Sequence, residues 1–268
     1  MAVDPSAKVH PTAVIEDGAS IGANAEIGPF AVVGPEVVLG ADVKLHSHAV
    51  VHGWTEVGDG TAIFPFASIG HMPQDLKFGG ERTQLTIGKR NRIREHVTMN
   101  PGTEGGGGIT RVGDDGLYMM GVHVGHDCIV GNNVILANNA SLGGHCVIED
   151  NVVIGALAGV HQFTRVGRGA MIGGLAAVVA DVIPYGTVIG ERAYLGGLNL
   201  VGLKRAGVDR DLVDGLRRAY KDLFQSKQPL AEAVERLRSG KEENALIAEV
   251  LDFIDGSGKR RITTPDDK

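Results

Sequence analysis

The chain has 268 residues, of which 43% are hydrophobic, and a formal net charge of −6. A chain of this size can bury a core, and its acidic balance argues against general binding to nucleic acid. The sequence shows no secretion signal and no run of about 18 apolar residues, so we expect a cytoplasmic protein without a membrane span. Its two cysteines, Cys128 and Cys146, are too few for a disulfide framework and are expected to be small buried side chains.

A six-residue repeat runs through the first 190 residues. Aliphatic residues recur at every sixth position from Val9 to Ile69, and the same phase returns and lasts to Met99. After a slip of one residue, the repeat continues over 112–178, with Tyr118 as its one exception to a branched aliphatic residue. A spacing of six excludes an amphipathic helix, whose apolar positions recur at three and four. It predicts a left-handed parallel β-helix, in which three short strands form each coil and aliphatic residues stack inside.

Two stretches interrupt this repeat. Residues 71–86 and 101–111 are too long to be the corners of coils. Loops of that length on a rigid scaffold are usually functional. We therefore expect a solenoid domain over residues 1–190 that carries two projecting loops.

Residues 191–268 are predicted to form a small α-helical C-terminal domain. After Asp209, which can cap a helix, apolar residues recur at spacings of three and four up to Leu223. Two further amphipathic helices are expected in PLAEAVERLRS and NALIAEVLDFID, and the final GKRRITTPDDK is expected to fray. The predicted fold class is mainly β, and the helices would cover the open end of the solenoid.

Four of the ten histidines cluster in the middle coils. With about eighteen residues per coil, His126 and His145 are one coil and one residue apart, and His161 is nearly one coil further along. These side chains should line up along one edge of the prism and point outward. A neutral histidine is a natural general base near pH 7, and Asp127 can fix the tautomer of His126. The same residues are also compatible with a metal site or with simple polar ladders at turns.

Several longer motifs occur in order between about residue 8 and residue 225. They are IGHMPQDLKFGGERTQLTIGKRNRIRE, NPGTEGGGGITRVG, HVGHDC, ILANNASLGGH, VHQF and NLVGLKR. Together they closely resemble the UDP-N-acetylglucosamine acyltransferase family, which catalyses the first step of lipid A biosynthesis. This resemblance is far more specific than the hexapeptide repeat alone.

The resemblance implies a homotrimer that transfers a 3-hydroxyacyl chain from acyl carrier protein to the 3-position of UDP-N-acetylglucosamine. It implies no metal and no dissociable cofactor. His126 corresponds to the general base of the family, and Asp127 orients it. The residues implied to bind the nucleotide sugar and the acyl donor are Asp75, Lys77, His123, Asn139, Gly144, His145, His161, Gln162, Asn199 and Arg205.

The chemistry agrees with these roles, because a sugar hydroxyl needs a base to attack a thioester and backbone N–H groups must receive the oxyanion. The turn at 143–144 offers such amides. Arg165, Arg168 and Lys204 would meet the acidic carrier protein. By family pattern, Gly174 would form the floor of the acyl groove, whereas its alternative role is to satisfy turn geometry.

The chain departs from the family pattern at three places. Asn100-Pro101 stands where the family often has His-Arg, Val201 replaces an acidic residue, and a basic pair is shortened to Arg205-Ala206. These departures bear on the nucleotide and carrier contacts and on the identity of the sugar. The alternatives are an N-acyltransferase that acts on a 3-amino analogue and a metal-binding or structural hexapeptide-repeat protein.

Overall fold

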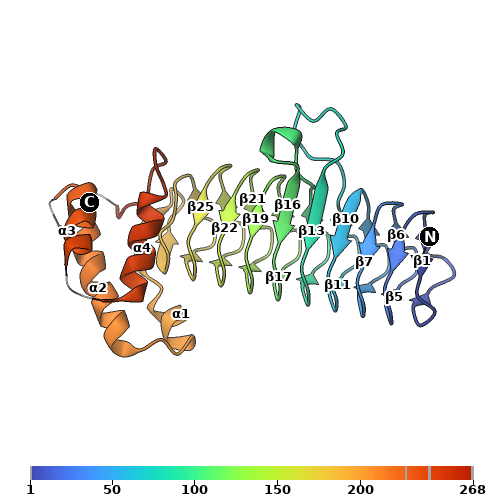
Figure 1. Cartoon of the computed structure of the whole chain (residues 1–268), viewed down its shortest axis with the longest axis horizontal. Helices are drawn as coiled ribbons and strands as arrows, with labels where there is room; N and C mark the ends of the chain where they lie inside the picture. The colour runs from blue at the N-terminus through green and yellow to red at the C-terminus, as the bar shows by residue number, and fades with distance from the viewer. Residues whose placement is uncertain (1, 227, 241–242, 267–268) are drawn as a thin grey trace.

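The computed structural model describes residues 2–226, 228–240 and 243–266. The chain forms a long three-sided prism of stacked coils, with helices gathered at its C-terminal end (Figure 1). Each strand from β1 to β24 pairs in parallel with the strand three places further along the chain. The predicted left-handed parallel β-helix with a helical C-terminal region is confirmed.

The three sides of the prism are three sheets. Sheet A contains β1 (Ala2–Val3), β4 (Ser20–Ile21), β7 (Val38–Leu39), β10 (Trp54–Val57), β13 (Gln84–Ile87), β16 (Ile109–Val112), β19 (Ile129–Val130), β22 (Val147–Ile148) and β25 (Arg165–Val166). Sheet B contains β2 (Lys8–Val9), β5 (Glu26–Ile27), β8 (Lys44–Leu45), β11 (Ala62–Ile63), β14 (Arg92–Ile93), β17 (Leu117–Tyr118), β20 (Ile135–Leu136), β23 (Val153–Ile154), β26 (Met171–Ile172), β28 (Gly186–Ile189) and β29 (Tyr194–Leu198). Sheet C contains β3 (Val14–Ile15), β6 (Val32–Val33), β9 (Val50–Val51), β12 (Ser68–Ile69), β15 (Thr98–Met99), β18 (His123–Val124), β21 (Ser141–Leu142), β24 (Gly159–Val160) and β27 (Ala177–Val178).

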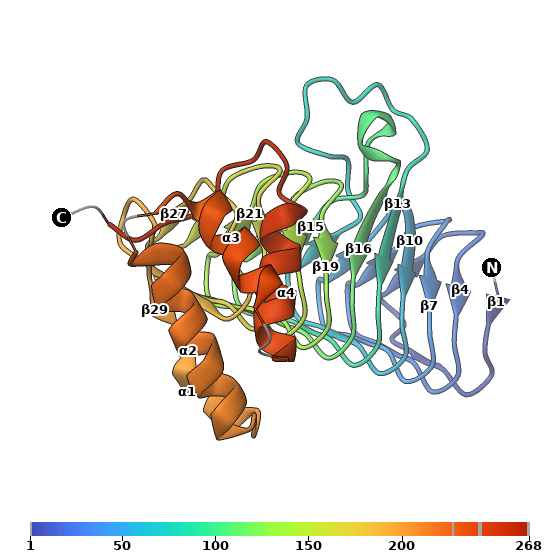
Figure 2. The ribbon, with the colours of Figure 1, turned by 60° about the vertical axis from the view of Figure 1, so that its left-hand side comes forward.

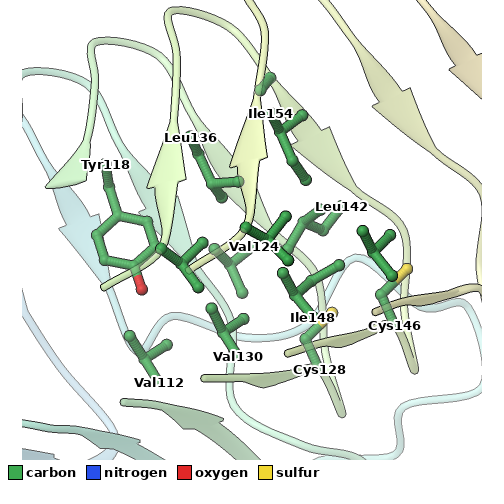
Figure 3. Packing of buried hydrophobic residues seen from close by; sticks show 14 of the residues in the cluster. Val112, Tyr118, Val124, Cys128, Val130, Leu136, Leu142, Cys146, Ile148 and Ile154 are labelled. Carbon is green, nitrogen blue, oxygen red and sulfur yellow. The ribbon is translucent and has the colours of Figure 1, made fainter. Parts of the chain in front are cut away.

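The core of the prism consists of stacked aliphatic side chains from successive coils. Val112, Val130 and Ile148 follow one another along sheet A and are buried (Figure 3). Cys128 and Cys146 are buried beside this column as unpaired thiols, as the sequence predicted. Each coil therefore rests on its neighbours, and burial of this apolar surface stabilises the stack.

Two loops stand off one side of the prism (Figures 1 and 2). The first joins β12 to β13, and the second joins β15 to β16 and contains a short 3-10 helix, η1 (Glu104–Gly106). The predicted loop ends at residues 86 and 111 were wrong, because β13 and β16 already begin at Gln84 and Ile109. β13 pairs with β10 on one side and with β16 on the other, each over four residues, which lengthens sheet A beneath the loops.

The C-terminal region contains the three predicted helices and one that was not predicted separately. The helices are α1 (Leu200–Arg205), α2 (Arg210–Phe224), α3 (Leu230–Ser239) and α4 (Ala245–Asp255). The carboxylate of Asp209 accepts the N–H of Asp211 at 2.8 Å and caps α2, as expected. Before the helices, β29 pairs antiparallel with β28 and extends sheet B past residue 190.

The prediction of a frayed tail is wrong for residues 261–264. The N–H of Asp181 donates to the carbonyl of Arg261, and the N–H of Thr263 donates to the carbonyl of Asp181, both at 2.8 Å. The N–H of Leu195 donates to Thr264 at 2.9 Å. The tail is ordered because it pairs with the exposed backbone at the end of the solenoid. Residues 267–268 lie outside the described part of the chain.

Candidate active site

The predicted histidine row lies at the corner where the chain passes from sheet C to sheet A. His126 and Asp127 form this corner after β18, and His145 occupies the next coil after β21. The N–H of His145 donates to the carbonyl of His126 at 2.9 Å. Their rings meet edge to face, with centroids 5.0 Å apart. The structure therefore brings these two histidines together along one edge.

His126 and Asp127 form a hydrogen-bonded pair. Nδ1 of His126 lies 2.7 Å from Oδ2 of Asp127, whose side chain is only 1% exposed. A carboxylate at Nδ1 keeps that nitrogen protonated, so Nε2 is left as the proton acceptor. Gly144 lies against this edge of the ring, since a Cβ on Gly144 would stand 2.6 Å from Nε2. The amide of Gly143 is already bonded to Val160 in the sheet ladder, which leaves Gly144 as the candidate oxyanion donor.

Two further histidines surround the pair. Burial lowers the pKa of His145, an effect that the nearby Asp127 carboxylate opposes. Burial likewise lowers the pKa of His123, and His126 adds to this effect. Nδ1 of His123 lies 2.8 Å from the hydroxyl of Thr98 on the preceding coil of sheet C. Both imidazoles are therefore neutral near pH 7 and present hydrogen-bonding atoms without charge.

The two loops contribute further polar groups beside the histidine corner. Asp75 and Lys77, in the first loop, both influence the pKa of His145, so they lie on the same side of the prism. Asp75 accepts the N–H of Lys77 at 3.0 Å. In the second loop, Thr103 donates both its N–H and its hydroxyl to Asp127, at 2.9 and 2.7 Å.

Thr103 was missed by sequence reasoning. The second loop interrupts the six-residue repeat, so periodicity assigned no direction to any of its side chains. Thr110 was missed for the same reason, although its hydroxyl accepts the N–H of Asp127 at 2.8 Å. The only sequence signal for these two residues was that each is a threonine in a glycine-rich segment, and this signal is weak.

The next coil only partly continues the histidine row. His161 and Gln162 follow β24 and are exposed, and Nδ1 of His161 bonds to the carbonyl of Gln162 at 3.1 Å. Phe163, rather than His161, stacks on His145, with centroids 4.4 Å apart. The expectation that His161 would extend the row directly was wrong, because it stands two residues before the matching position.

Asn139 and Gly174 lie at another corner, where the chain passes from sheet B to sheet C. Asn139 follows β20 and has a left-handed φ of 58°. Gly174 follows β26 and is exposed, and a Cβ there would lie 3.1 Å from the carbonyl oxygen of Ala156. These two residues do not meet the histidine corner within one chain.

Asn199 and Arg205 are also separated from the histidines. Asn199 caps α1 by accepting the N–H of Gly202 at 2.9 Å, and it donates to the carbonyl of Gly169 at 3.0 Å. Both predicted residues line a cavity of about 750 Å³ between α1 and the outer face of sheet B. Val153 lines the same cavity, whose walls are largely apolar. One chain therefore carries two groups of predicted site residues on different faces.

The predicted docking cations have different surroundings. The guanidinium of Arg165 stacks 3.9 Å from the ring centroid of Phe253 and lies 3.7 Å from the Asp181 carboxylate. It holds α4 against the solenoid, and its role in carrier docking stays a prediction. Arg168 is half-exposed and pairs with Glu249 at 2.9 Å. Lys204 is exposed on α1.

His126, Asp127 and His145 also offer ligand atoms that lie within 4.8 Å of one another, as a metal site requires. The shortest contact among them is the 2.7 Å hydrogen bond of the His126–Asp127 pair.

Among the described residues, no helix is both long and apolar enough to cross a membrane.

Family models match both the solenoid and the C-terminal part of the chain. Residues 181–263 match the family described as UDP N-acetylglucosamine O-acyltransferase, domain 2. Residues 18–53 match the bacterial transferase hexapeptide family. Residues 110–137 and 145–174 match the hexapeptide repeat of succinyl-transferase.

Individual relatives agree with these matches. An acyl-(acyl-carrier-protein)–UDP-N-acetylglucosamine O-acyltransferase from Paracoccus denitrificans is 57% identical over 208 residues, which cover 76% of this chain and 77% of the relative. The relative of the same name from Rhizobium etli is 52% identical and covers 81% of this chain and 80% of its own length.

Solved structures show the same relationship. A UDP-N-acetylglucosamine acyltransferase from Campylobacter jejuni has a TM-score of 0.91 at 39% identity, covering 97% of this chain and 100% of that one. The enzyme from Arabidopsis has a TM-score of 0.82 at 34% identity, covering 98% and 100%. On these grounds the chain belongs to the acyl-(acyl-carrier-protein)–UDP-N-acetylglucosamine O-acyltransferase family.

Proposed function

We propose that this chain transfers a 3-hydroxyacyl group from acyl carrier protein to the 3-position of UDP-N-acetylglucosamine, the first step of lipid A biosynthesis. Its relatives bear the name of this O-acyltransferase, and family membership makes the chain an acyltransferase. The observation that carries the proposal is the hydrogen-bonded His126–Asp127 pair, which lies at an edge of the prism and is contacted by Thr103 of the second loop.

The pair suits acyl transfer from a thioester. Nε2 of His126 takes the proton of the sugar hydroxyl while the hydroxyl oxygen attacks the thioester carbonyl. Asp127 stabilises the imidazolium that forms, and the amide of Gly144 donates to the oxyanion. When the tetrahedral intermediate collapses, the carbon–sulfur bond breaks and His126 returns the proton to the departing thiolate. Beyond these protein groups, the reaction as written needs only the two substrates.

The separation of the two groups of site residues supports a homotrimer with sites between neighbouring chains. The histidine corner lies on one face, whereas Asn199 and Arg205 lie by a cavity on another. If sheet B of a second copy faces sheet C of the first, the histidine corner of one chain meets Asn199 and Arg205 of the other. A heterologous contact of this kind closes into a three-membered ring when successive copies are related by a threefold rotation.

The outer face of sheet C suits such a contact. The first residue of each strand faces outward, and none of these residues in sheet C is Lys, Arg, Asp or Glu. They are Val14, Val32, Val50, Ser68, Thr98, His123, Ser141, Gly159 and Ala177. Small uncharged side chains allow two prisms to approach closely without desolvating charges.

The outer face of sheet B offers a place for the acyl chain. Leu117, Ile135, Val153 and Met171 occupy successive outward positions, and the last two line the cavity beneath α1. Gly174 follows at the corner. Its φ is not in the left-handed region, so the backbone there does not require glycine. This supports its role as an open end of the acyl groove.

The remaining polar residues suit the two substrates. Lys77 and Asp75, beside the histidine corner, are placed to contact the sugar nucleotide. Arg168, Lys204 and Arg205 form a basic group near the cavity that suits an acidic carrier protein. We place this reaction in the cytoplasm, where acyl carrier protein and nucleotide sugars are available.

The direct test is an acyl-transfer assay with a choice of acceptors and donors. The purified protein is incubated with UDP-N-acetylglucosamine or its 3-amino analogue and with a panel of 3-hydroxyacyl carrier proteins. We expect transfer to the 3-hydroxyl. Exclusive transfer to the amine would establish an N-acyltransferase, and transfer to neither acceptor would overturn the proposal.

The close approach of His126, Asp127 and His145 makes metal binding the second candidate. Elemental analysis of the active protein separates the two. One metal ion per chain, together with activity lost to a chelator and restored by that ion, would replace the general-base mechanism.

A further inference from the structure

We infer that Thr103 is a positioning residue for the His126–Asp127 pair. This inference rests on the proposed function of His126 as the base. It assigns a role to the second loop, in which Thr103 comes just before the short helix η1. Thr103 does not touch the reacting atoms, because the carboxylate of Asp127 stands between it and His126.

The hydrogen bonds define how Thr103 acts. Its N–H donates to Oδ1 of Asp127 at 2.9 Å, and its hydroxyl donates to Oδ2 at 2.7 Å. Nδ1 of His126 lies 2.7 Å from the same Oδ2. The carboxylate is therefore held by two donors on one side and by the imidazole on the other. With both oxygens engaged, the carboxylate has one orientation, and so has the ring that it holds.

The second loop also covers the carboxylate. Gly106 passes so close to it that a Cβ would lie 2.0 Å from Cγ of Asp127. Thr103 itself is 6% exposed, and the Asp127 side chain is 1% exposed. Shielding from water strengthens the hydrogen bonds of the pair, because competing solvent is excluded. A loop that merely connected two coils would need neither these two hydrogen bonds nor a glycine packed on the carboxylate.

The test removes the hydroxyl while keeping the backbone N–H. Thr103→Val should lower kcat about tenfold, the scale of one hydrogen bond to a charged group, and leave KM for UDP-N-acetylglucosamine within about twofold. Thr103→Ser should restore at least half of the wild-type kcat, since it returns the donor. Thr61→Val is the matched control, because Thr61 is also buried and its hydroxyl donates to the carbonyl of Gly88 at 3.0 Å, away from the site.

A double variant separates positioning from a general structural role. In an Asp127→Ala background no carboxylate remains to be positioned, so Thr103→Val should lower kcat by less than about twofold. An equal fold loss in both backgrounds, or a Thr103→Val enzyme with more than half of the wild-type kcat, would overturn the inference. Thr103→Ala provides the same comparison if Thr103→Val does not fold, as judged by its melting curve. Failure of the proposed function is distinguishable, because wild-type protein would then show no transfer.

Discussion

Two residues of the candidate site occupy strained positions in the backbone. Asp127 and His145 have φ values of 59° and 61°, in the left-handed region. This conformation costs roughly 1 kcal/mol for a residue with a Cβ, although Asp, Asn and His tolerate it better than most. In successive coils it directs both side chains to the same edge of the prism. The corner geometry of the solenoid thus assembles the site from residues one coil apart.

Substitution of His126 tests its role as the base. His126→Ala should lower kcat about 100-fold or more, the scale of losing a general base, with an unchanged melting temperature. The matched control is His10→Ala, an exposed histidine at the other end of the prism, which should keep full activity. Turnover near the wild-type value in His126→Ala would remove this residue from the mechanism.

Three histidines whose pKa is lowered in the fold make stability depend on pH. Burial lowers the pKa of His71, His123 and His145 below the ordinary value of about 6.5. In the window just below pH 6.5 the unfolded chain binds more protons than the folded chain, so the free energy of unfolding falls as pH falls. Above about pH 6.5 the stabilisation is complete.

Thermal melting between pH 7.5 and 5.5 measures this slope. We expect the melting temperature to fall with pH, and His123→Gln to flatten the decrease because one of the three groups is removed. His10→Gln is the matched control and should retain the wild-type slope. An identical slope in wild type and His123→Gln would contradict the assignment.

At the scale of elements, one buried carboxylate joins the last coils to the C-terminal segments. Asp181 is 1% exposed and lies 3.0 Å from Nε of Arg260 in the tail. It also lies 3.7 Å from Arg165, whose guanidinium stacks on Phe253 of α4. The hydroxyl of Ser257 donates to Asp181 at 3.2 Å. The helices therefore attach to the solenoid through an ionic contact as well as through apolar packing.

Removing Asp181 should be costly. Asp181→Ala leaves Arg165 partly buried without its partner, and we expect a loss of about 3 kcal/mol in the free energy of unfolding. Glu26→Ala removes a carboxylate whose ion pairs with Lys8 and Lys44 are exposed, so it should cost under about 1 kcal/mol. Urea unfolding measures both. Equal losses would show that the buried contact adds nothing beyond a surface pair.

The corner between sheets B and C should set the length of the acyl chain. Gly174→Met places a side chain at the end of the proposed groove, so donors that are several methylenes shorter should become preferred, at about 0.8 kcal/mol per buried methylene. Rates on long and short donors, with a melting curve, measure this. Leu175→Met is the control, because Leu175 is already exposed beside it. An unchanged donor ranking in Gly174→Met would contradict the groove.

For the whole molecule, the proposed trimer predicts that a charge introduced on sheet C disrupts the assembly, whereas a charge introduced on sheet A does not. Ser68 faces outward from sheet C, and Ser20 faces outward from sheet A. Ser68→Glu should break the assembly and the activity together, because each site draws on two chains and a buried unpaired charge is costly. Ser20→Glu should leave both intact. Sedimentation with parallel activity assays measures these outcomes, and an active monomer would contradict shared sites.

The solenoid could be predicted from the sequence alone, because each coil contacts mainly the coils before and after it. A period of six therefore specifies both the strands and the inward side chains, as Ile21 and Leu39 show by their burial. The three longer helices were equally readable from their apolar spacing. The His126–Asp127 pair was predictable because its members are adjacent in the chain and the corner turns both outward.

Contacts between segments that follow no repeat could be learned only from the folded structure. Thr103 reaches Asp127 from a loop whose path the periodicity does not describe. Arg165 meets Phe253 because α4 docks on the last coils, although the two residues are 88 positions apart. The placement of Asn199 away from the histidines likewise depends on how α1 packs against sheet B. Such contacts depend on the combined packing of distant segments, which no local pattern records.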